Sequence, residues 1–278
     1  MSVQRDGNLE SGTLNEPGAT RRVHRISARE ASILMLLAVL VGLVSGLSAV
    51  VLSTAVHEAT AALKVFQGRW WLIGVPAVGA ALSALYLHNW LKDQAGHGVP
   101  ELIRSIGFGG GRLRRDLIYS RLLSSFLTVG SGGSAGLEGP IATSGGAIGS
   151  SIGHWFGFNE RRRTLLLGYG VAGGVAAIFN APLTGTVFAL EVILGEWSAL
   201  SILPTIVAAV SATQVSRLVL GNQFAFSHEI FAFSTVDLLA CLLLGVCTGL
   251  LSVAFQRGLR FSEHWFAKAL KPLWLRAA

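Results

Sequence analysis

The chain has 278 residues, of which 51% are hydrophobic and only 13% are charged, whereas soluble domains carry about a quarter charged residues. With a mean hydropathy of +0.57, this composition excludes an ordinary water-soluble domain and predicts a membrane protein, whose partner is the lipid bilayer. The net charge of +7 is assigned to cytoplasmic-side arginines under the positive-inside rule. The sequence shows no basic patch on a soluble face, so nucleic acid is not an expected partner.

The first 30 residues are polar and basic and precede the first apolar run. Their arginines are Arg5, Arg21, Arg22, Arg25 and Arg29. No apolar core with a small-residue cleavage site follows, so residues 1–30 predict a disordered cytoplasmic tail rather than a signal peptide. The run Ile33–Val56 is long enough to cross a bilayer as a helix. We therefore expect a multi-pass protein of the cell membrane, with a cytoplasmic N terminus and a transmembrane domain over residues 31–278.

Further along the chain, regular membrane spans give way to shorter, interrupted ones. Trp70–Leu87 predicts a second crossing, after which a basic cluster ending at Arg115 returns the chain to the cytoplasmic side. The later apolar runs are Leu117–Val129, Ile141–Phe156, Leu165–Ile178, Thr186–Leu194, Ser201–Leu220 and Leu238–Phe255. Several are short or broken by glycine and proline. Broken helices in a membrane line cavities and place their ends near the midplane, where substrates bind.

Three glycine-containing clusters stand at these breaks. They read GHGVPE (Gly96–Glu101), GLEGP (Gly136–Pro140) and FNAPLTG (Phe179–Gly185). In the first two, glycines precede a proline and then an apolar run, which is typical of a helix start because proline suits the first turn. A helix start exposes free N–H groups and a partial positive charge, and glycine lets a ligand approach them closely. The clusters therefore predict an anion site at membrane depth.

Glu138 is the lone carboxylate of the second cluster. Its side chain can occupy the amide-lined site as an internal competitor of the anion, and protonation or displacement would then free the path. An acidic residue within a membrane segment is by default a functional hypothesis. The alternative is a helix-capping glutamate that faces the lipid headgroups.

These motifs resemble those of the CLC chloride channel and transporter family. GHGVPE is similar to the family motif GSGIPE, GSGGSAGLEGP (Gly130–Pro140) to the stretch ending in GREGP, and AAIFNAPLTGTVFALE (Ala176–Glu191) to the segment after it. The resemblance implies an all-α broken-helix bundle, half of an inverted repeat, in a homodimer with one anion pathway per subunit and no cofactor or metal. It implies that Glu138 is the gate. The anion-binding residues that it implies are Gly96, His97, Gly98, Leu137, Glu138 and Gly139.

The sequence departs from the family pattern at several positions. His97 stands where chloride-selective members have serine, and its side chain either donates to the anion or points into a polar crevice. Leu137 replaces the arginine of GREGP. Glu191 lies one residue before the position of the exchangers' inner glutamate, where this chain has Val192. Glu191 is therefore either structural or part of a proton path. The second-half motifs of the family are absent from the chain.

The motifs and the resemblance together predict chloride or other anion transport through a glutamate-gated pathway, either channel-like or weakly coupled to protons. One alternative is a proton-coupled fluoride or other anion antiporter, and another is a non-conducting half-protein. An alternative of a different class is an intramembrane serine protease, with Ser131 or Ser134 as the nucleophile and His154 as the base, which requires hydrogen-bond reach between them.

Overall fold

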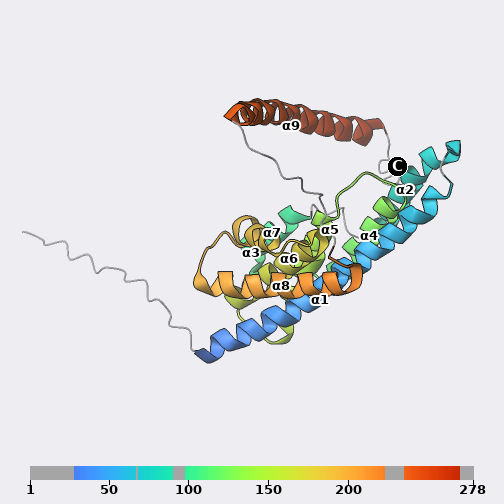
Figure 1. The fold of residues 1–278 in the computed structure, drawn as a ribbon. Helices are drawn as coiled ribbons and strands as arrows, with labels where there is room; N and C mark the ends of the chain where they lie inside the picture. Colours follow the sequence, from blue (N-terminus) through green and yellow to red (C-terminus); the bar gives the residue numbers. More distant parts are fainter. Residues whose placement is uncertain (1–27, 67, 90–97, 223–234, 270–278) are drawn as a thin grey trace, which may run out of the picture.

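The structure, a computed structural model, describes residues 28–66, 68–89, 98–222 and 235–269, and the regular structure in these ranges is helical (Figure 1). The predicted all-α fold is confirmed. The elements are α1 (Ala28–Lys64), η1 (Trp70–Gly74), α2 (Val75–Asn89), α3 (Val99–Gly109), α4 (Leu117–Gly130), α5 (Glu138–Trp155), α6 (Glu160–Phe179), α7 (Pro182–Phe188), η2 (Ala189–Leu194), α8 (Ala199–Leu220) and α9 (Thr235–Ala269). Most of the predicted tail, residues 1–27, lies outside the described residues.

Four helical segments in the described ranges are long and apolar enough to cross a membrane. They are Glu30–Lys64, Trp70–Asn89, Ser201–Leu220 and Asp237–Phe266. The 37 residues of α1 make a rod of about 55 Å, which exceeds the roughly 30 Å of a hydrocarbon core. The apolar run Ile33–Val56 that predicts the first crossing lies within α1, and the helix continues beyond it. Helix-favouring residues after Val56, several of them alanine, let α1 continue to Lys64.

Glycine faces bring the central helices close together. A methyl group built on Gly170 of α6 would lie 1.9 Å from the carbonyl oxygen of Gly145 on α5. On the other side of the bundle, methyl groups on Gly42 and Gly46 of α1 would lie within 3 Å of the α8 backbone. Small residues at such spacing allow close backbone approach, which is how helices associate where lipid removes the hydrophobic driving force.

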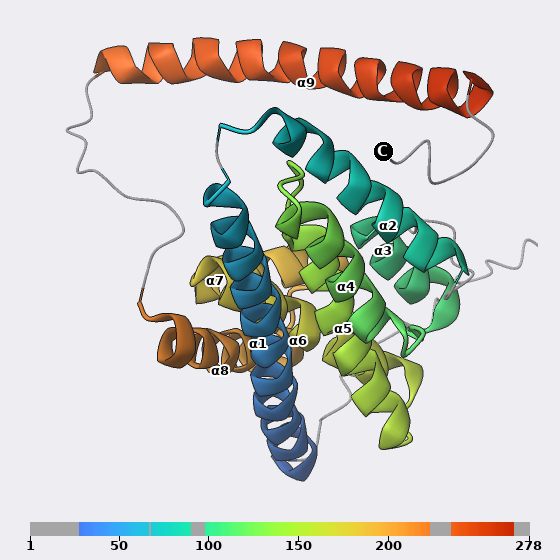
Figure 2. The same cartoon turned by 90° about the vertical axis from the view of Figure 1, so that its right-hand side faces the viewer.

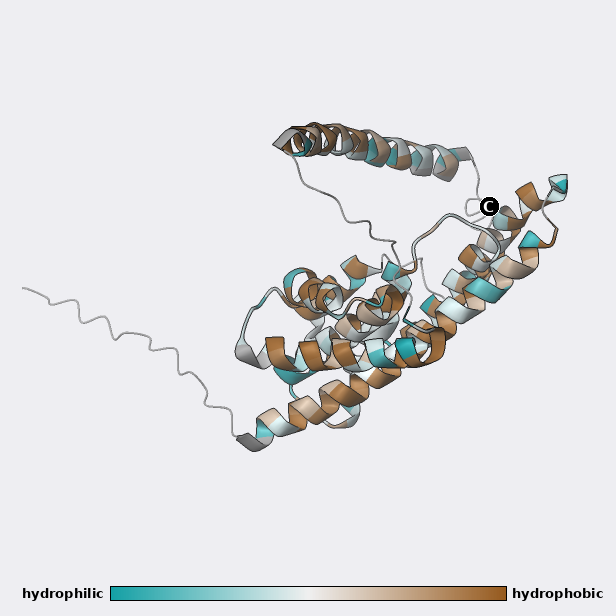
Figure 3. Cartoon of the chain, viewed as in Figure 1, coloured by the Kyte–Doolittle hydropathy of each residue, from teal (hydrophilic) through white to brown (hydrophobic). Residues whose placement is uncertain are grey.

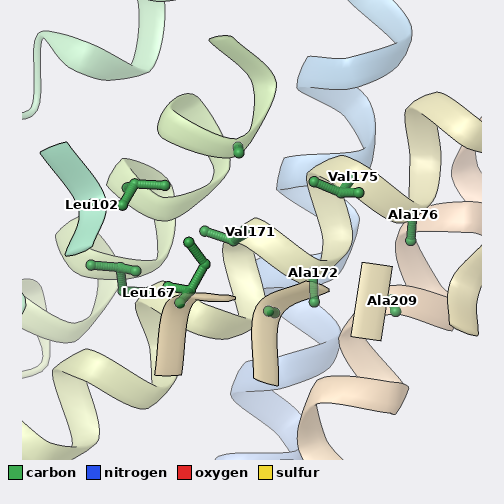
Figure 4. Close-up of a cluster of buried hydrophobic side chains, with 10 residues drawn as sticks. Leu102, Leu167, Val171, Ala172, Val175, Ala176 and Ala209 are labelled. Carbon is green, nitrogen blue, oxygen red and sulfur yellow. The ribbon is translucent and has the colours of Figure 1, made fainter. Parts of the chain in front are cut away.

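A buried apolar cluster ties α3 to the middle of α6 (Figure 4). Leu102 of α3 is fully buried and belongs to the same cluster as Leu167 and Val171 of α6 and Ala209 of α8. Leu102 also faces Gly146 of α5, where a methyl group would lie 2.8 Å from its side chain. The short helix α3 is therefore held in the core by a residue in its first turn.

The last helix, α9, lies apart from the bundle formed by the other helices (Figure 2). Its side chains are exposed wherever the structure describes them. Hydrophobic residues nevertheless cover much of α9, as they do α1 and α8 (Figure 3). The folded core that positions the site is thus built from α1 to α8.

Candidate anion site at two helix starts

The first two glycine clusters begin helices that meet at their N-terminal ends. Gly98 is the residue before α3, and Glu138 and Gly139 open α5. A methyl group built on Gly98 would lie 3.6 Å from the Cα atom of Gly139. We call this meeting point, formed by Gly98, Glu138 and Gly139, the α3/α5 junction. The prediction that both clusters are helix starts is confirmed.

The junction presents backbone N–H groups that no acceptor among the described residues takes up. Within the described part of the chain, the amides of Val99, Glu138 and Gly139 donate to no acceptor, while the Ile141 amide already bonds to the Leu137 carbonyl oxygen at 3.0 Å. Pro100 stands in the first turn of α3 and Pro140 in that of α5, and neither has an N–H group. Two helix dipoles therefore direct their positive ends at one place, an arrangement that favours an anion.

The backbone of Gly98 has a conformation that suits only glycine. Its φ of 56° and ψ of −114° lie outside the regions that residues with a Cβ atom adopt readily. This conformation turns the chain into α3 immediately beside Gly139, where no atom of the described residues would contact an added methyl group. The described residues therefore leave space on the side-chain face of Gly139.

Glu138 is the first residue of α5, and its carboxylate curls back along the preceding chain. Its Oε2 atom occupies the space beside Gly136, where a methyl group would lie 1.9 Å away. The side chain is exposed in the described chain. A carboxylate at this position interacts favourably with the N-terminal end of the helix. The Glu138 side chain therefore lies beside the predicted anion site. The described residues leave this side chain exposed on one side.

The remaining predicted site residues have different surroundings. Gly96 and His97 lie outside the described residues. Leu137 caps α5 without a side-chain hydrogen bond and packs against the apolar cluster that contains Ile141 and Ala177. Its side chain thus serves packing, while its backbone precedes the junction.

Glu191 belongs to a different element from the residues of the α3/α5 junction. It lies exposed on η2, a π-helical turn that packs mainly against α3, α6, α7 and α8. π-Helical turns occur frequently at functional sites. The adjacent Val192 is also exposed. The assignment of Glu191 to a structural role or a proton path stays a prediction.

Sequence reasoning missed Arg121, which supports the junction from α4. Its guanidinium contacts the carboxylate of Glu101 at 3.2 Å, and its side chain is only 7% exposed against 28% for Glu101. Glu101 stands in the first turn of α3, three residues after Gly98. Arg121 thus ties the start of α3 to α4. The available signal was a single basic residue within the otherwise apolar run Leu117–Val129.

Two hydroxyl groups of α5 make hydrogen bonds near the Arg121–Glu101 ion pair. Ser144 of α5 donates to the carbonyl oxygen of Ile118 on α4 at 2.7 Å. Thr143 donates to the carbonyl oxygen of Gly139 at 2.8 Å, which fixes the first turn of α5. The α3/α5 junction is therefore held by hydrogen bonds, an ion pair and the buried Leu102.

The serine protease alternative is wrong in its geometry. Ser131 and Ser134 precede the N-terminal end of α5, and His154 lies in its last turn. A helix rises 1.5 Å per residue, so these groups are separated by roughly 24 Å along the helix axis. A nucleophile and its base must be within hydrogen-bond reach, and α5 holds these residues apart.

The third cluster is a structural junction between α6 and α8. Asn180 ends α6 in the left-handed conformation, with a φ of 54°. Its side-chain oxygen accepts a hydrogen bond from Nε of Arg217 on α8 at 2.6 Å. Pro182 then opens α7, a helix of only seven residues. The cluster therefore turns the chain rather than adding amides to the α3/α5 junction.

Comparison with known proteins gives the family. A family model described as voltage gated chloride channel matches residues 79–278. The chain belongs to this family. It is 31% identical over 250 residues to the H⁺/Cl⁻ exchange transporter ClcA of Vibrio cholerae, an alignment that covers 84% of the chain and 53% of the relative. The chain spans about half the length of the curated relatives it matches.

Solved structures of the CLC family share the fold. The X-ray structure of a slow cyanobacterial Cl⁻/H⁺ antiporter matches with a TM-score of 0.72 and 25% identity, over 87% of this chain and 60% of that one. A CLC-type fluoride/proton antiporter matches with a TM-score of 0.75 and 23% identity, over 90% of this chain and 63% of the antiporter. The predicted CLC resemblance and the all-α membrane fold are confirmed.

Proposed function

We propose that this chain contributes to anion transport across a membrane, with the α3/α5 junction as the anion site and Glu138 as its gate. The observation that carries the proposal is the convergence of two helix starts at Gly98 and Gly139, whose amides are unpaired among the described residues, with the acidic residue Glu138 at the start of α5. Membership of the CLC family supports it. The matched relatives are named as exchangers of chloride or fluoride with protons.

Amides suit transport better than a fixed cation would. A permeant ion must bind strongly enough to enter the site and weakly enough to leave it. Helix-end dipoles contribute on the order of 1 kcal/mol to anion binding and about 2 kcal/mol in partly buried geometries. Arg121, the nearby cation, already faces the Glu101 carboxylate. The pathway therefore attracts an anion without holding it tightly.

Glu138 gates the site because its carboxylate carries the same charge as the permeant anion. In this proposal the ionised side chain competes with the ion for the helix-start amides. Its protonation, or its displacement by the ion, would free the site. The exposed side chain at the first position of α5 has room to move between these positions.

We propose chloride as the permeant anion and channel-like or weakly proton-coupled transport. Val192 stands at the position of the exchangers' inner glutamate, and this favours weak coupling. The alternative is proton-coupled fluoride transport, which His97 favours because it replaces the serine that is typical of chloride-selective members. The proposed partners are the lipid bilayer and a second copy of the chain, in the cell membrane.

The proposed orientation has the N terminus of α1 in the cytoplasm. Glu30, at the start of α1, pairs with Arg162 in the first turn of α6. Arg163 next to it donates to the carbonyl oxygen of Gly110, beside the arginine-rich loop between α3 and α4. The start of α1 and these arginines therefore share one end of the bundle, which the positive-inside rule assigns to the cytoplasm.

Flux from liposomes tests the proposal directly. The purified chain is reconstituted into vesicles loaded with chloride or fluoride, and ion-selective electrodes record efflux while a dye follows internal pH. Glu138→Gln should raise anion efflux about tenfold at neutral pH, the ratio that corresponds to about 1.4 kcal/mol of competition for the site, and should remove most of the pH dependence.

Glu160→Gln is the matched control, because Glu160 also opens a helix but lies at the far end of the bundle. It should leave efflux unchanged. Efflux no faster than from protein-free vesicles refutes transport by this chain and supports the non-conducting half-protein. Equal pH dependence in wild type and Glu138→Gln refutes the gate. Chloride efflux that is much slower than fluoride efflux, accompanied by a change in internal pH, supports the fluoride alternative.

A further inference from the structure

A polar cavity lies at the opposite end of α5 from the α3/α5 junction. It has a volume of about 350 Å³ and is formed between the loop that joins α3 to α4 and the last turns of α5. Its polar lining residues are Arg112, Arg114, Arg115, Ser150, Ser151 and His154. We call this cavity the arginine pocket. Its three arginines have no role at the α3/α5 junction.

The wall of the arginine pocket is fixed by a buried hydroxyl. Ser150 is 2% exposed, accepts a hydrogen bond from the amide of Leu113 at 3.0 Å and donates to the carbonyl oxygen of Gly111 at 2.6 Å. The loop that carries Arg112 is thereby bound to α5 on both sides of that residue. The pocket is therefore a built feature of the fold rather than a transient gap between loops.

The chemistry of the pocket suits an anionic oxygen ligand. No carboxylate of the described residues pairs with Arg112 or Arg115, whereas Arg114 pairs with Asp116. The Ser151 hydroxyl is buried and has no hydrogen-bond partner among the described residues. A buried hydroxyl without a partner is costly, so a ligand that accepts its hydrogen bond would be favoured. Arginine donors match phosphate oxygens in geometry as well as charge.

The neighbouring side chains place the pocket at the level of lipid headgroups. Trp155 and Phe156, which follow His154, are 83% and 56% exposed, and their ring centroids lie 6.2 Å apart. Exposed aromatic residues of this kind anchor membrane proteins at the membrane–water interface. On α4, which starts after the loop, Tyr119 and Leu123 are also exposed. They offer an apolar surface for an acyl chain.

We propose that the arginine pocket binds the phosphate of an anionic phospholipid from the surrounding leaflet. Basic pockets between membrane helices on the cytoplasmic side are suited to such headgroups. The phosphate accepts from Arg112, Arg115 and Ser151, while the acyl chains run along the exposed side of α4. The lipid would hold the C-terminal end of α5 in place. The N-terminal end of the same helix forms the α3/α5 junction.

Lipid binding to the intact chain tests this proposal without any measurement of flux, so its outcome is separate from that of the transport proposal. The purified chain is titrated in detergent with phosphatidylglycerol or phosphatidylcholine, and native mass spectrometry counts bound lipid. The double variant Arg112→Gln/Arg115→Gln should bind phosphatidylglycerol about thirtyfold more weakly, since each basic residue near a membrane surface contributes about 1 kcal/mol.

The control is Arg257→Gln/Arg260→Gln, which removes the same charge at the same spacing from exposed positions on α9. It should bind phosphatidylglycerol as the wild type does. Ser151→Ala should weaken binding about tenfold, the effect of one hydrogen bond to a charged group, and this small change is a second test should the double variant fail to fold.

Three results would overturn the proposal. The first is equal weakening in the two double variants, which would indicate general surface charge. The second is equal affinity for phosphatidylglycerol and phosphatidylcholine, together with binding of inorganic phosphate in the pocket at millimolar concentration. The third is unchanged affinity in Ser151→Ala, which would place the lipid outside the pocket.

Discussion

Replacing Gly170 with alanine tests how strictly the contact between α5 and α6 positions the α3/α5 junction. Both Gly170 and Gly145 are buried, and the added methyl group would lie 1.9 Å from the Gly145 carbonyl oxygen. Ordinary contact begins at 3.4 Å. The obstacle is backbone, which cannot rotate away as a side chain would. The helices must therefore separate by about 1.5 Å, or the interface must slide, to admit one methyl group.

The expected loss of stability follows from two opposing effects. Overpacking a well-packed core costs about 1–3 kcal/mol, and a rigid backbone obstacle places this contact at the upper end. Alanine in place of glycine in a helix interior contributes about 1 kcal/mol of stability. The net loss is about 2 kcal/mol, which corresponds to a fall in Tm of roughly 4–8 °C for a chain of this size.

Thermal unfolding in detergent, followed by circular dichroism, measures this loss. Gly245→Ala is the matched control, because Gly245 is an exposed helical glycine of α9 with no atom within 4 Å of an added methyl group. It should keep or slightly raise the Tm. Gly170→Ala should also lower anion efflux, since α5 carries Glu138 at its start. A Tm for Gly170→Ala equal to that of Gly245→Ala would refute the close contact between α5 and α6.

Four further changes probe the site itself. Glu101→Gln removes the carboxylate that faces the buried Arg121. It should cost about 2 kcal/mol in unfolding free energy, less than the 3–5 of a fully buried pair because Glu101 is partly exposed, and unchanged thermal stability would argue against a supporting role. Gly98→Ala forces a Cβ atom onto a backbone with a φ of 56° and should cost about 1–3 kcal/mol. Gly139→Ala should be tolerated because the space there is open, so equal Tm values for the two variants would contradict the assigned Gly98 conformation. His97→Ser should shift the flux ratio toward chloride, and an unaltered ratio would mean that this side chain faces elsewhere.

The sequence alone was sufficient for the all-α fold and for the starts of the two helices at the site. The glycine and proline residues of GHGVPE and GLEGP predict helix starts, and α3 and α5 begin there. Such predictions succeed because capping and proline preferences act within one helical turn. The same local chemistry puts Glu138 at the first position of α5, where the structure has it, while its role as the gate stays a prediction.

Only the tertiary structure brought these pieces together. Gly98 and Gly139 belong to different helices, and their contact depends on how closely α3 and α5 pack in the bundle. The ion pair of Arg121 with Glu101 and the separation of Ser134 from His154 likewise depend on where whole helices lie. Local preferences act over a few residues. Contacts between distant segments are decided by the fit of complete surfaces, such as the glycine face that joins α5 to α6.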